Sequence, residues 1–299
     1  MIFCAAVLLL AAVQGSDSTF NEIRTRIQLE PGAQVGLAYI DLASGDTLFM
    51  EADASFHAAS TMKVPVMIEL FRRATTGSFG MRQPLLIVNQ FASIVDGSAY
   101  SLDSTSDSDT TLYHRVGGRV PVDTLLRLMI TRSSNLATNT LIALVGAGEV
   151  NRTMRSLGAQ RIEVLRGVED GKAFDKGLIN TTTARDLATI LRAIEEGRAG
   201  SAEATREMRE ILLAQQFNEK IPAGLPPGIR VAHKTGEITA HSHDAAIVYP
   251  PGRKPYVLVV LTRGIQDGIR SSKLIADISS MVYARNSARA NIPPALITQ

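Results

Sequence analysis

The order of its strand-like and helix-like segments is what most constrains the fold of this chain. Two strand-like runs, at residues 35–41 and 47–50, lie near the start and are joined through Ser44-Gly45-Asp46, which is typical of a hairpin. Three more strand-like runs follow one another near the end, at 229–234, 245–249 and 256–262. Helical patterns dominate the sequence between them. This order predicts an α/β (α+β) fold, in which segments from both ends of the chain build an antiparallel sheet around an inserted helical region.

The expected helices share an apolar period of three to four residues. They are predicted at 20–29, 64–71, 121–130, 136–145, 150–157, 184–196, 202–215 and 269–283. Residues 96–118 are rich in Ser, Asp, Thr and Gly and have no apolar period, so we expect a long surface excursion there. A short strand-like run at 162–165 leads into an irregular stretch, 166–183.

The first residues have the character of a secretory signal. The apolar run Ile2–Val13 is too short to span a bilayer, and a cleavage before Ser16 would leave residues 16–299 as one catalytic domain, periplasmic or secreted. A basic segment before the run is missing, and a buried first helix or strand is the alternative. Cys4 is the only cysteine, so the mature chain would have no disulfide, thiolate metal site or cysteine nucleophile.

Composition excludes several classes of function. A chain of 299 residues, 45% hydrophobic and 20% charged, can bury a substantial core. The formal net charge of +2 gives no reason to expect binding to nucleic acid or to an anionic membrane. Trp is absent and aromatic residues make up 5%, which argues against a stacking platform for sugars or single-stranded nucleic acid.

The stretch Ser60-Thr61-Met62-Lys63 opens one of the predicted helices. Residues i and i+3 share a helix face, so the Ser60 hydroxyl and the Lys63 amine are expected close enough to exchange a proton. This suits a serine nucleophile activated by a lysine of lowered pKa, with the helix N-terminus stabilising an oxyanion. The alternative is an ordinary helix start with a solvated lysine.

Two further stretches can complete such a site. Ser133-Ser134-Asn135 falls between two helices, where polar side chains can project into a cleft; the alternative is a plain helix cap. Lys234-Thr235-Gly236 ends a strand, with Lys234 and Gly236 on one face. A lysine there can hold an anion, and the glycine lets a substrate approach the strand backbone.

Taken in order, Ser-x-x-Lys, Ser-x-Asn and Lys-Thr-Gly resemble the active-site set of the class A β-lactamases and penicillin-binding proteins. Asn180-Thr181-Thr182-Thr183 is similar to the end of that family's omega loop, and the resemblance covers about residues 20–283. It implies a five-stranded antiparallel sheet flanked by helices, with an inserted all-α lobe at about residues 68–210. The active site is then expected between the two parts.

The resemblance also implies the roles of the catalytic residues. Ser60 would attack the carbonyl of a β-lactam or of a D-Ala-D-Ala-like peptide, with Lys63 helping as base. Ser133 would pass a proton to the leaving nitrogen. Glu169 is the best match to the glutamate that activates water for deacylation, and Asp170 beside it is the rival. The chain is expected to be a monomer that needs no cofactor and acts on a small molecule.

The same resemblance implies the substrate-binding residues. Asn135 would bind the substrate amide, Lys234 and Thr235 would hold its carboxylate, and Gly236 would border it. The backbone N–H groups of Ser60 and Glu237 would form the oxyanion hole. His243 falls where many class A enzymes carry a carboxylate-binding arginine, and Arg263 is a candidate substitute.

Several residues depart from the family's pattern. Ser134 replaces a structural aspartate, and Asn180 replaces the aspartate that commonly closes the omega loop on an arginine, here Arg166. The loop at 166–171 lacks the usual Glu-Pro-Glu-Leu-Asn. Glu237 is bulky and acidic beside the predicted oxyanion hole, where it could repel an anionic substrate.

The histidines allow a second chemistry. His241 and His243 are two apart on a predicted strand, with Asp244 adjacent and His233 nearby, and two histidines with a carboxylate can bind zinc. The rest of a metallohydrolase pattern is missing, so no metal is expected. The primary prediction is a serine β-lactamase. The alternatives are a D-Ala-D-Ala peptidase, transpeptidase or esterase on the same scaffold, or a β-lactam sensor that deacylates slowly.

Overall fold

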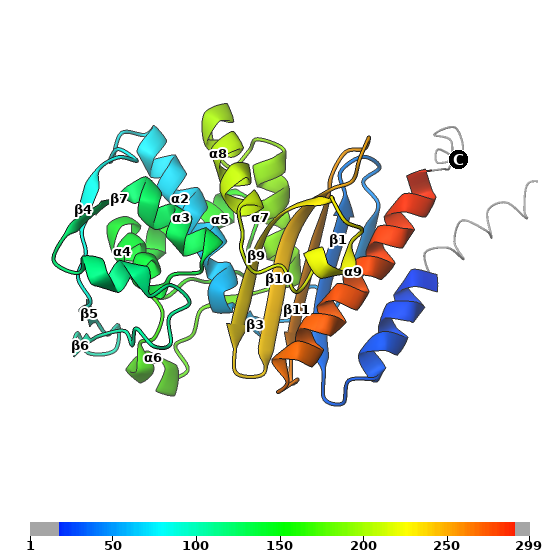
Figure 1. Cartoon of the computed structure of the whole chain (residues 1–299), viewed down its shortest axis with the longest axis horizontal. Helices are drawn as coiled ribbons and strands as arrows, with labels where there is room; N and C mark the ends of the chain where they lie inside the picture. The colour runs from blue at the N-terminus through cyan, green and yellow to red at the C-terminus, as the bar shows by residue number, and fades with distance from the viewer. Residues whose placement is uncertain (1–17, 291–299) are drawn as a thin grey trace, which may run out of the picture.

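The computed structural model describes residues 18–290, and the predicted signal segment with Cys4 lies outside the described residues. A five-stranded sheet, antiparallel throughout, forms one half of the molecule (Figure 1). Its strands, in spatial order, are β2 (Thr47–Met50), β1 (Gln34–Asp41), β11 (Tyr256–Arg263), β10 (His241–Tyr249) and β9 (Arg230–Ile238). The predicted fold class is confirmed. Both ends of the chain contribute to the sheet because β1 pairs with β11 along its whole length.

The last strands are longer than the sequence pattern indicated. β10 begins at His241 instead of residue 245, and β9 continues to Ile238 instead of ending at residue 234. His241 pairs with Ile238 on one side and with Arg263 on the other. Partners on both sides supply the backbone hydrogen bonds, so this polar segment is extended in spite of its weak strand propensity.

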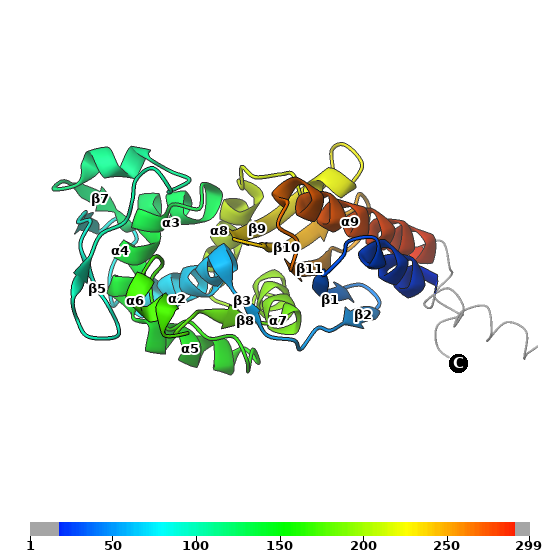
Figure 2. The same ribbon diagram turned by 90° about the horizontal axis from the view of Figure 1, so that it is seen from below.

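Alternation along the strands gives each face of the sheet its own apolar core. On β11, Tyr256, Leu258 and Val260 face one core, and Val257 and Val259 face the other. The first core is covered by α9 (Gly268–Ala290) and by a helix at residues 18–28. Figure 2 shows these two terminal helices side by side over the sheet.

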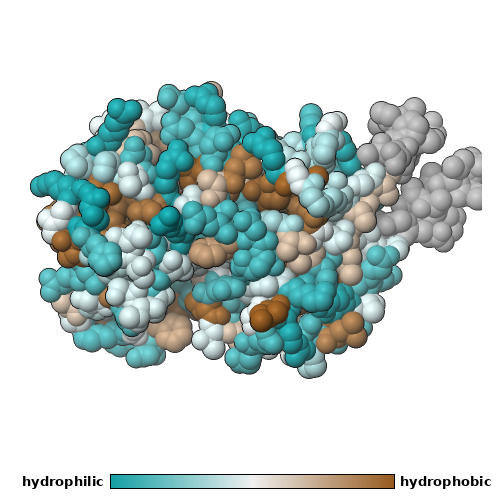
Figure 3. Space-filling view, viewed as in Figure 1, coloured by the Kyte–Doolittle hydropathy of each residue, from teal (hydrophilic) through white to brown (hydrophobic). Residues whose placement is uncertain are grey.

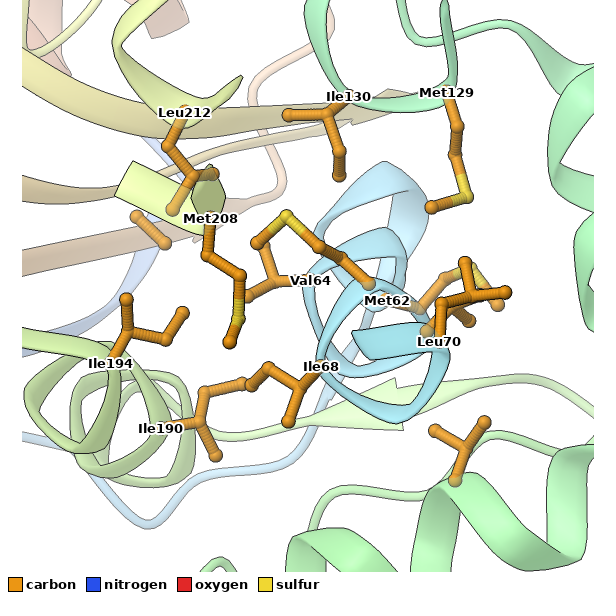
Figure 4. Close-up of a cluster of buried hydrophobic side chains, with 14 of the residues drawn as sticks. Met62, Val64, Ile68, Leu70, Met129, Ile130, Ile190, Ile194, Met208 and Leu212 are labelled. Atoms are coloured by element: carbon orange, nitrogen blue, oxygen red, sulfur yellow. The ribbon is translucent and has the colours of Figure 1, made fainter. Parts of the chain in front are cut away.

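The second core joins the sheet to the helical part of the chain. The helices of this part of the chain are α2 (Lys63–Thr75), α3 (Val122–Thr131), α4 (Asn135–Val145), α5 (Ala147–Ser156), α6 (Gly171–Asp175), α7 (Ala184–Glu195) and α8 (Ala202–Leu213). The first nine residues of α2 are all buried, as expected of a helix surrounded by packing on every side. Met62, Val64 and Ile68 meet side chains of α3, α7 and α8 around it (Figure 4). A buried helix is therefore the rigid support on which the Ser60 turn is mounted.

The helical part is not all α. It contains the short pairs β4 (Pro84–Leu86) with β7 (Arg119–Pro121), and β5 (Phe91–Ala92) with β6 (Ala99–Tyr100). The strand-like run at 162–165 is reduced to one bridge, between Glu163 and Thr181. Nor is the stretch 96–118 only a surface excursion. Leu112 packs into the core, and Asp107 and Asp109 are 6% and 2% exposed.

On the face seen in Figure 3, no single hydrophobic patch dominates the surface, because hydrophobic residues alternate with hydrophilic ones. In the part of the chain that the structure describes, no helix has the length and apolar character needed to cross a membrane.

Candidate active site

Ser60 lies on a short 3₁₀ turn, η1 (Ala59–Met62), that leads directly into α2. The backbone φ of Ala59 is +44°, in the left-handed region that residues other than glycine seldom adopt. Strand β9 packs against this turn at Gly236, where an added Cβ would lie 3.1 Å from the backbone nitrogens of both Ser60 and Thr61. A side chain there would press on the turn, so glycine is needed for the close approach of the protein's own backbone.

Lys63, the first residue of α2, is completely buried (0% exposed). Its Nζ lies 2.6 Å from the carbonyl oxygen of Ser133, 2.9 Å from Oδ1 of Asn135 and 3.1 Å from Oγ of Ser133. Desolvation lowers the pKa of Lys63 to about 7, against the opposing attraction of Asp107 and Glu169. The amine is therefore neutral in a large fraction of molecules near neutral pH.

These contacts define what the neutral amine can do. The Ser133 carbonyl and Asn135 Oδ1 only accept hydrogen bonds, so they take the two N–H groups of a neutral amine. The lone pair is then left for a hydroxyl proton, and Ser133 Oγ occupies that third direction. The helical spacing predicted that the Ser60 hydroxyl and the Lys63 amine lie close enough to exchange a proton, but Ser60 is not among these hydrogen-bond partners of Lys63. Ser133 is the hydroxyl that the amine meets.

Ser133 is held between two buried lysines. Its φ is +59°, and its Oγ lies 3.1 Å from Nζ of Lys63 and 3.1 Å from Nζ of Lys234. Lys234 is 0% exposed, and its Nζ also donates to the carbonyl of Thr235 at 2.9 Å. Desolvation and the neighbouring Lys63 lower the pKa of Lys234 well below its ordinary value. A hydroxyl in this position can exchange a proton with either amine.

Asn135 connects Lys63 to the predicted water-activating residue. Its Oδ1 accepts from Lys63 at 2.9 Å, and its Nδ2 donates to Oε1 of Glu169 at 2.7 Å. Glu169 as a whole residue is exposed, but its carboxylate faces Asn135. Desolvation raises the pKa of Glu169, although the Asn135 hydrogen bond opposes the shift. The structure thus brings Ser60, Lys63, Ser133, Asn135, Glu169 and Lys234 into one site around the end of α2.

The loop that carries Glu169 is fixed one residue earlier, by Asn139 of α4. This buried side chain donates to the carbonyl of Val168 at 3.0 Å and accepts from its amide at 2.6 Å. Gly167 leaves the necessary room, because a Cβ there would lie 2.3 Å from Oδ1 of Asn139. Glu169 itself has a φ of +62°. Packing of the loop against Asn139 therefore requires glycine at position 167.

Asp170, the rival base, points away from the site. Its side chain accepts from the hydroxyl of Ser93 at 2.9 Å, from the amide of Ala173 at 3.1 Å and from the amide of Ile94 at 3.0 Å. Desolvation alone would raise the pKa of Asp170, but these hydrogen bonds outweigh it and lower the pKa. The residue serves as the N-cap of α6.

Asn180 closes the loop without an ion pair. Its Oδ1 accepts from the amide of Leu165 at 2.8 Å, and its Nδ2 donates to the carbonyl of Arg166 at 3.0 Å. The Arg166 guanidinium instead donates to the carbonyls of Leu178 and Gly167, at 2.9 and 3.0 Å. Backbone carbonyls thus replace the carboxylate that the family pattern led us to expect for Arg166.

Sequence reasoning missed Asp107. Ser134 caps α4 in the ordinary way, accepting from the amide of Ala137 at 3.3 Å, as the alternative interpretation of that motif proposed. Asp107 adds a carboxylate to the same helix end, accepting from the amide of Asn135 at 2.9 Å and of Leu136 at 3.1 Å. No local signal in the Ser/Asp-rich loop distinguishes Asp107 from its neighbours.

Lys220 was also missed. It is 1% exposed, and its Nζ lies 2.7 Å from Oε1 of Glu237 and 3.2 Å from Oε1 of Glu219. Desolvation would lower the pKa of Lys220, but the pairing with Glu237 outweighs it and raises the pKa. The predicted negative charge of Glu237 beside the site is consequently paired with a cation, which weakens the repulsion of an anion.

The two residues predicted to bind the substrate carboxylate have other partners in the structure. His243 is 0% exposed; its Nε2 lies 2.8 Å from the carbonyl oxygen of His57 and its Nδ1 2.8 Å from that of Ser242. Burial lowers the pKa of His243 to about 4, so the ring is neutral and walled in by backbone. The guanidinium of Arg263, its candidate substitute, donates to Oε1 of Gln34 and to the carbonyl of Ser55.

The histidine-rich strand is a structural feature. Asp244 points to the opposite face of β10 from His243, and its carboxylate lies 2.9 Å from Nδ1 of His233 and 3.1 Å from the amide of Ile221. Within residues 18–290, no group of three His, Cys, Asp or Glu side chains is arranged to hold a metal ion.

Together, the antiparallel sheet, the buried α2 and the Ser-Lys-Ser-Lys arrangement define the fold shared by β-lactamases and penicillin-binding proteins. Residues 18–285 match the model of the Beta-lactamase enzyme family, and the chain belongs to that family.

Similar proteins carry both kinds of name. The β-lactamase AST-1 of Nocardia asteroides is 31% identical over 89% of this chain and 82% of its own length. A β-lactamase of Streptomyces albus G is 27% identical over 90% and 85% of the two chains. A variant of PBP-A, solved as an acyl-enzyme complex with penicillin G, is 28% identical, with a TM-score of 0.80 over 91% of this chain and 97% of that one. A β-lactamase structure from Sphaerobacter thermophilus is 27% identical, with a TM-score of 0.77 over 94% and 99%.

Proposed function

We propose that this protein is a serine β-lactamase of the class A type, which opens the β-lactam ring through an acyl-enzyme on Ser60. The observation that carries the proposal is the side chain of Asn135, which joins a buried lysine at 2.9 Å to a glutamate at 2.7 Å. One amide thereby links the base for acylation to the base for deacylation.

Acylation uses the buried groups. With a pKa of about 7, Lys63 takes the proton that Ser60 loses as its Oγ attacks the carbonyl, directly or through Ser133. Ser133, 3.1 Å from both amines, delivers a proton to the leaving ring nitrogen as the C–N bond breaks. Lys234 donates hydrogen bonds to the substrate carboxylate, and the N–H groups of Ser60 and Glu237 stabilise the oxyanion.

Deacylation uses the loop that carries Glu169. The carboxylate of Glu169 takes a proton from a water molecule as the water oxygen attacks the ester carbon. As the bond between that carbon and the Ser60 oxygen breaks, Glu169 returns the proton to the Ser60 oxygen, so both residues regain their starting forms. The desolvation that raises the pKa of Glu169 brings its basicity nearer to neutral pH. The side chain of Asn135 keeps the Glu169 carboxylate directed into the site. The same side chain also accepts a hydrogen bond from Lys63, so it links the two residues.

The second candidate is a penicillin-binding peptidase or a slowly deacylating sensor. It is favoured by the likeness to PBP-A and by the unusual loop, in which Glu169 adopts a φ of +62° outside the family's usual motif. Both candidates share the acylation chemistry and differ only in the lifetime of the adduct. In either case we propose that the mature protein acts outside the cytoplasm, following the apolar run Ile2–Val13.

The test is hydrolysis of a chromogenic β-lactam by the purified protein, with intact-mass analysis of the adduct. We expect turnover by the wild type, and neither turnover nor adduct in Ser60→Ala. An adduct that persists for hours in the wild type would favour the second candidate. Labelling of Ser60→Ala would move the nucleophile elsewhere and overturn both.

A further inference from the structure

The loop at residues 96–118 delivers a carboxylate to the buried end of a helix that carries catalytic groups. Asp107 is 6% exposed, and its oxygens accept from the amides of Asn135 (2.9 and 3.0 Å), Leu136 (3.1 Å) and Asp109 (3.1 Å) and from the hydroxyl of Tyr113 (3.0 Å). So many donors around one carboxylate fix its position.

The contacts complete the N-terminus of α4. An α-helix begins with four N–H groups that have no partner inside the helix. Here the N–H groups of Asn135 and Leu136 donate to Asp107, that of Ala137 donates to the Ser134 hydroxyl, and that of Ser134 donates to the carbonyl of Leu128. Ser134 alone could not satisfy all four. The carboxylate also places negative charge at the positive end of the helix dipole.

The same contacts reach the active site through one residue. The backbone of Asn135 is held by Asp107, and its side chain bonds both Lys63 and Glu169. We propose that Asp107 is a positioning residue of the active site: its carboxylate holds the start of α4 so that Asn135 is set between the amine of Lys63 and the carboxylate of Glu169. No motif assigns this role, and Asp107 does not touch the reacting atoms.

The charge of Asp107 has a measurable consequence at Lys63. The charged groups that act on Lys63 are Lys234 from β9, Glu169 from its loop, and Asp107. Asp107 and Glu169 favour the protonated amine, whereas desolvation opposes it. Removing the charge at residue 107 should therefore lower the pKa of Lys63 further. A helix cap without a charge would not produce this shift.

The experiment is a titration of Lys63 by NMR, in protein labelled with ¹³C at its seven lysines. Asp107→Asn keeps an acceptor oxygen for the helix and removes the charge, and we expect the pKa of Lys63 to fall by about one pH unit. Asp109→Asn is the matched control, because Asp109 is as deeply buried but bonds Thr111 and Arg132 and not α4. An unchanged titration in Asp107→Asn, or an equal shift in Asp109→Asn, would overturn the proposal.

A second variant keeps the test decisive if Asp107→Asn does not fold. Asp107→Glu retains the charge and moves the oxygens by one methylene, so it should displace the amide resonances of Asn135 and Leu136 in ¹H–¹⁵N spectra. Resonances unchanged from the wild type would overturn the positioning role. The inference gives Lys63 and Glu169 the parts they have in the proposed function, but both readouts are independent of catalysis. If the protein fails to hydrolyse β-lactams, the proposed function falls while the NMR shifts still decide the role of Asp107.

Discussion

In the proposed mechanism, acylation and deacylation use two different sides of the active site, and these two sides are built in different ways. On the acylating side, Lys63 and Lys234 are 0% exposed and Ser133 is 7% exposed, and each lies on or directly beside a regular element of the core. On the deacylating side, Glu169 is exposed, lies on a loop and has a left-handed backbone. The first side is held by the packing of α2, α4 and β9. The position of the second side depends on hydrogen bonds from Asn135 and Asn139 and on the small size of Gly167.

This difference teaches that the two half-reactions should fail separately. Changes in the loop should leave acylation nearly intact, because the core that positions the lysines does not depend on the loop. Slow deacylation on an unchanged acylating side would turn a β-lactamase into a penicillin-binding protein. The likeness of this chain to proteins of both names fits that view.

The largest effect should come from Glu169→Gln. Without a carboxylate to activate water, we expect hydrolysis of the acyl-enzyme to slow by roughly 10²–10⁴-fold while the rate of adduct formation stays within a few-fold. Intact mass spectrometry at successive times measures both steps. Asp175→Asn, an exposed carboxylate at the end of the nearby α6, is the control and should behave as the wild type. Similar adduct lifetimes in Glu169→Gln and the wild type would remove Glu169 from the mechanism.

The pH dependence tests the acylating side. In the proposed mechanism neutral Lys63 is the base, so acylation should fall as the pH drops through the Lys63 pKa of about 7. Two pH units below the pKa, the neutral fraction is about fiftyfold smaller than at the pKa, and the acylation rate should follow it. Stopped-flow measurements on Glu169→Gln follow acylation alone and should show this limb at lower pH, because Glu169 favours the protonated amine of Lys63. An acylation rate that is flat from pH 5 to 8 would contradict a lysine base.

Substitutions at two glycines separate loop packing from loop flexibility. Gly167→Ala forces a Cβ against Asn139, so we expect it to lower the free energy of unfolding by about 1–3 kcal/mol and to slow deacylation. Gly171→Ala meets nothing within 4 Å and serves as the matched control, with stability equal to or slightly above that of the wild type. Urea unfolding and adduct lifetimes measure the two quantities. Equal behaviour of the two variants would mean that Asn139 does not fix the loop.

The smallest effect concerns Glu237. Its ion pair with Lys220 is half exposed, so removing the negative charge in Glu237→Gln should change binding by only about 0.2–1 kcal/mol. The KM for an anionic β-lactam should fall by at most about fivefold, and by less at high salt, with kcat unchanged. Glu22→Gln, on the helix at residues 18–28, is a remote control. A rise in KM would mean that Glu237 orders Lys220 for substrate instead of competing with it.

Local sequence was sufficient for the elements that carry the site. The three short motifs named Ser60, Lys63, Ser133, Asn135 and Lys234, and the structure brings all five together. They could be found because the three motifs, taken in order, resemble the active-site set of the class A β-lactamases. Apolar periodicity located the helices, although the partners of β9 and β10 decided how far those strands extend.

The sequence alone left three matters open that only the tertiary structure decided. Alternation placed His241 and His243 on one face of a strand, but only the packing of helices on the sheet determined that this face is buried at His243. Lys220, 17 residues before Glu237, becomes its partner because the two segments are folded against each other. Asp107 is one of several aspartates in a polar loop until the helix N-terminus at Asn135, 28 residues later, lies beside it. Burial and long-range hydrogen bonds join residues that are distant in the chain, and no local pattern contains that information.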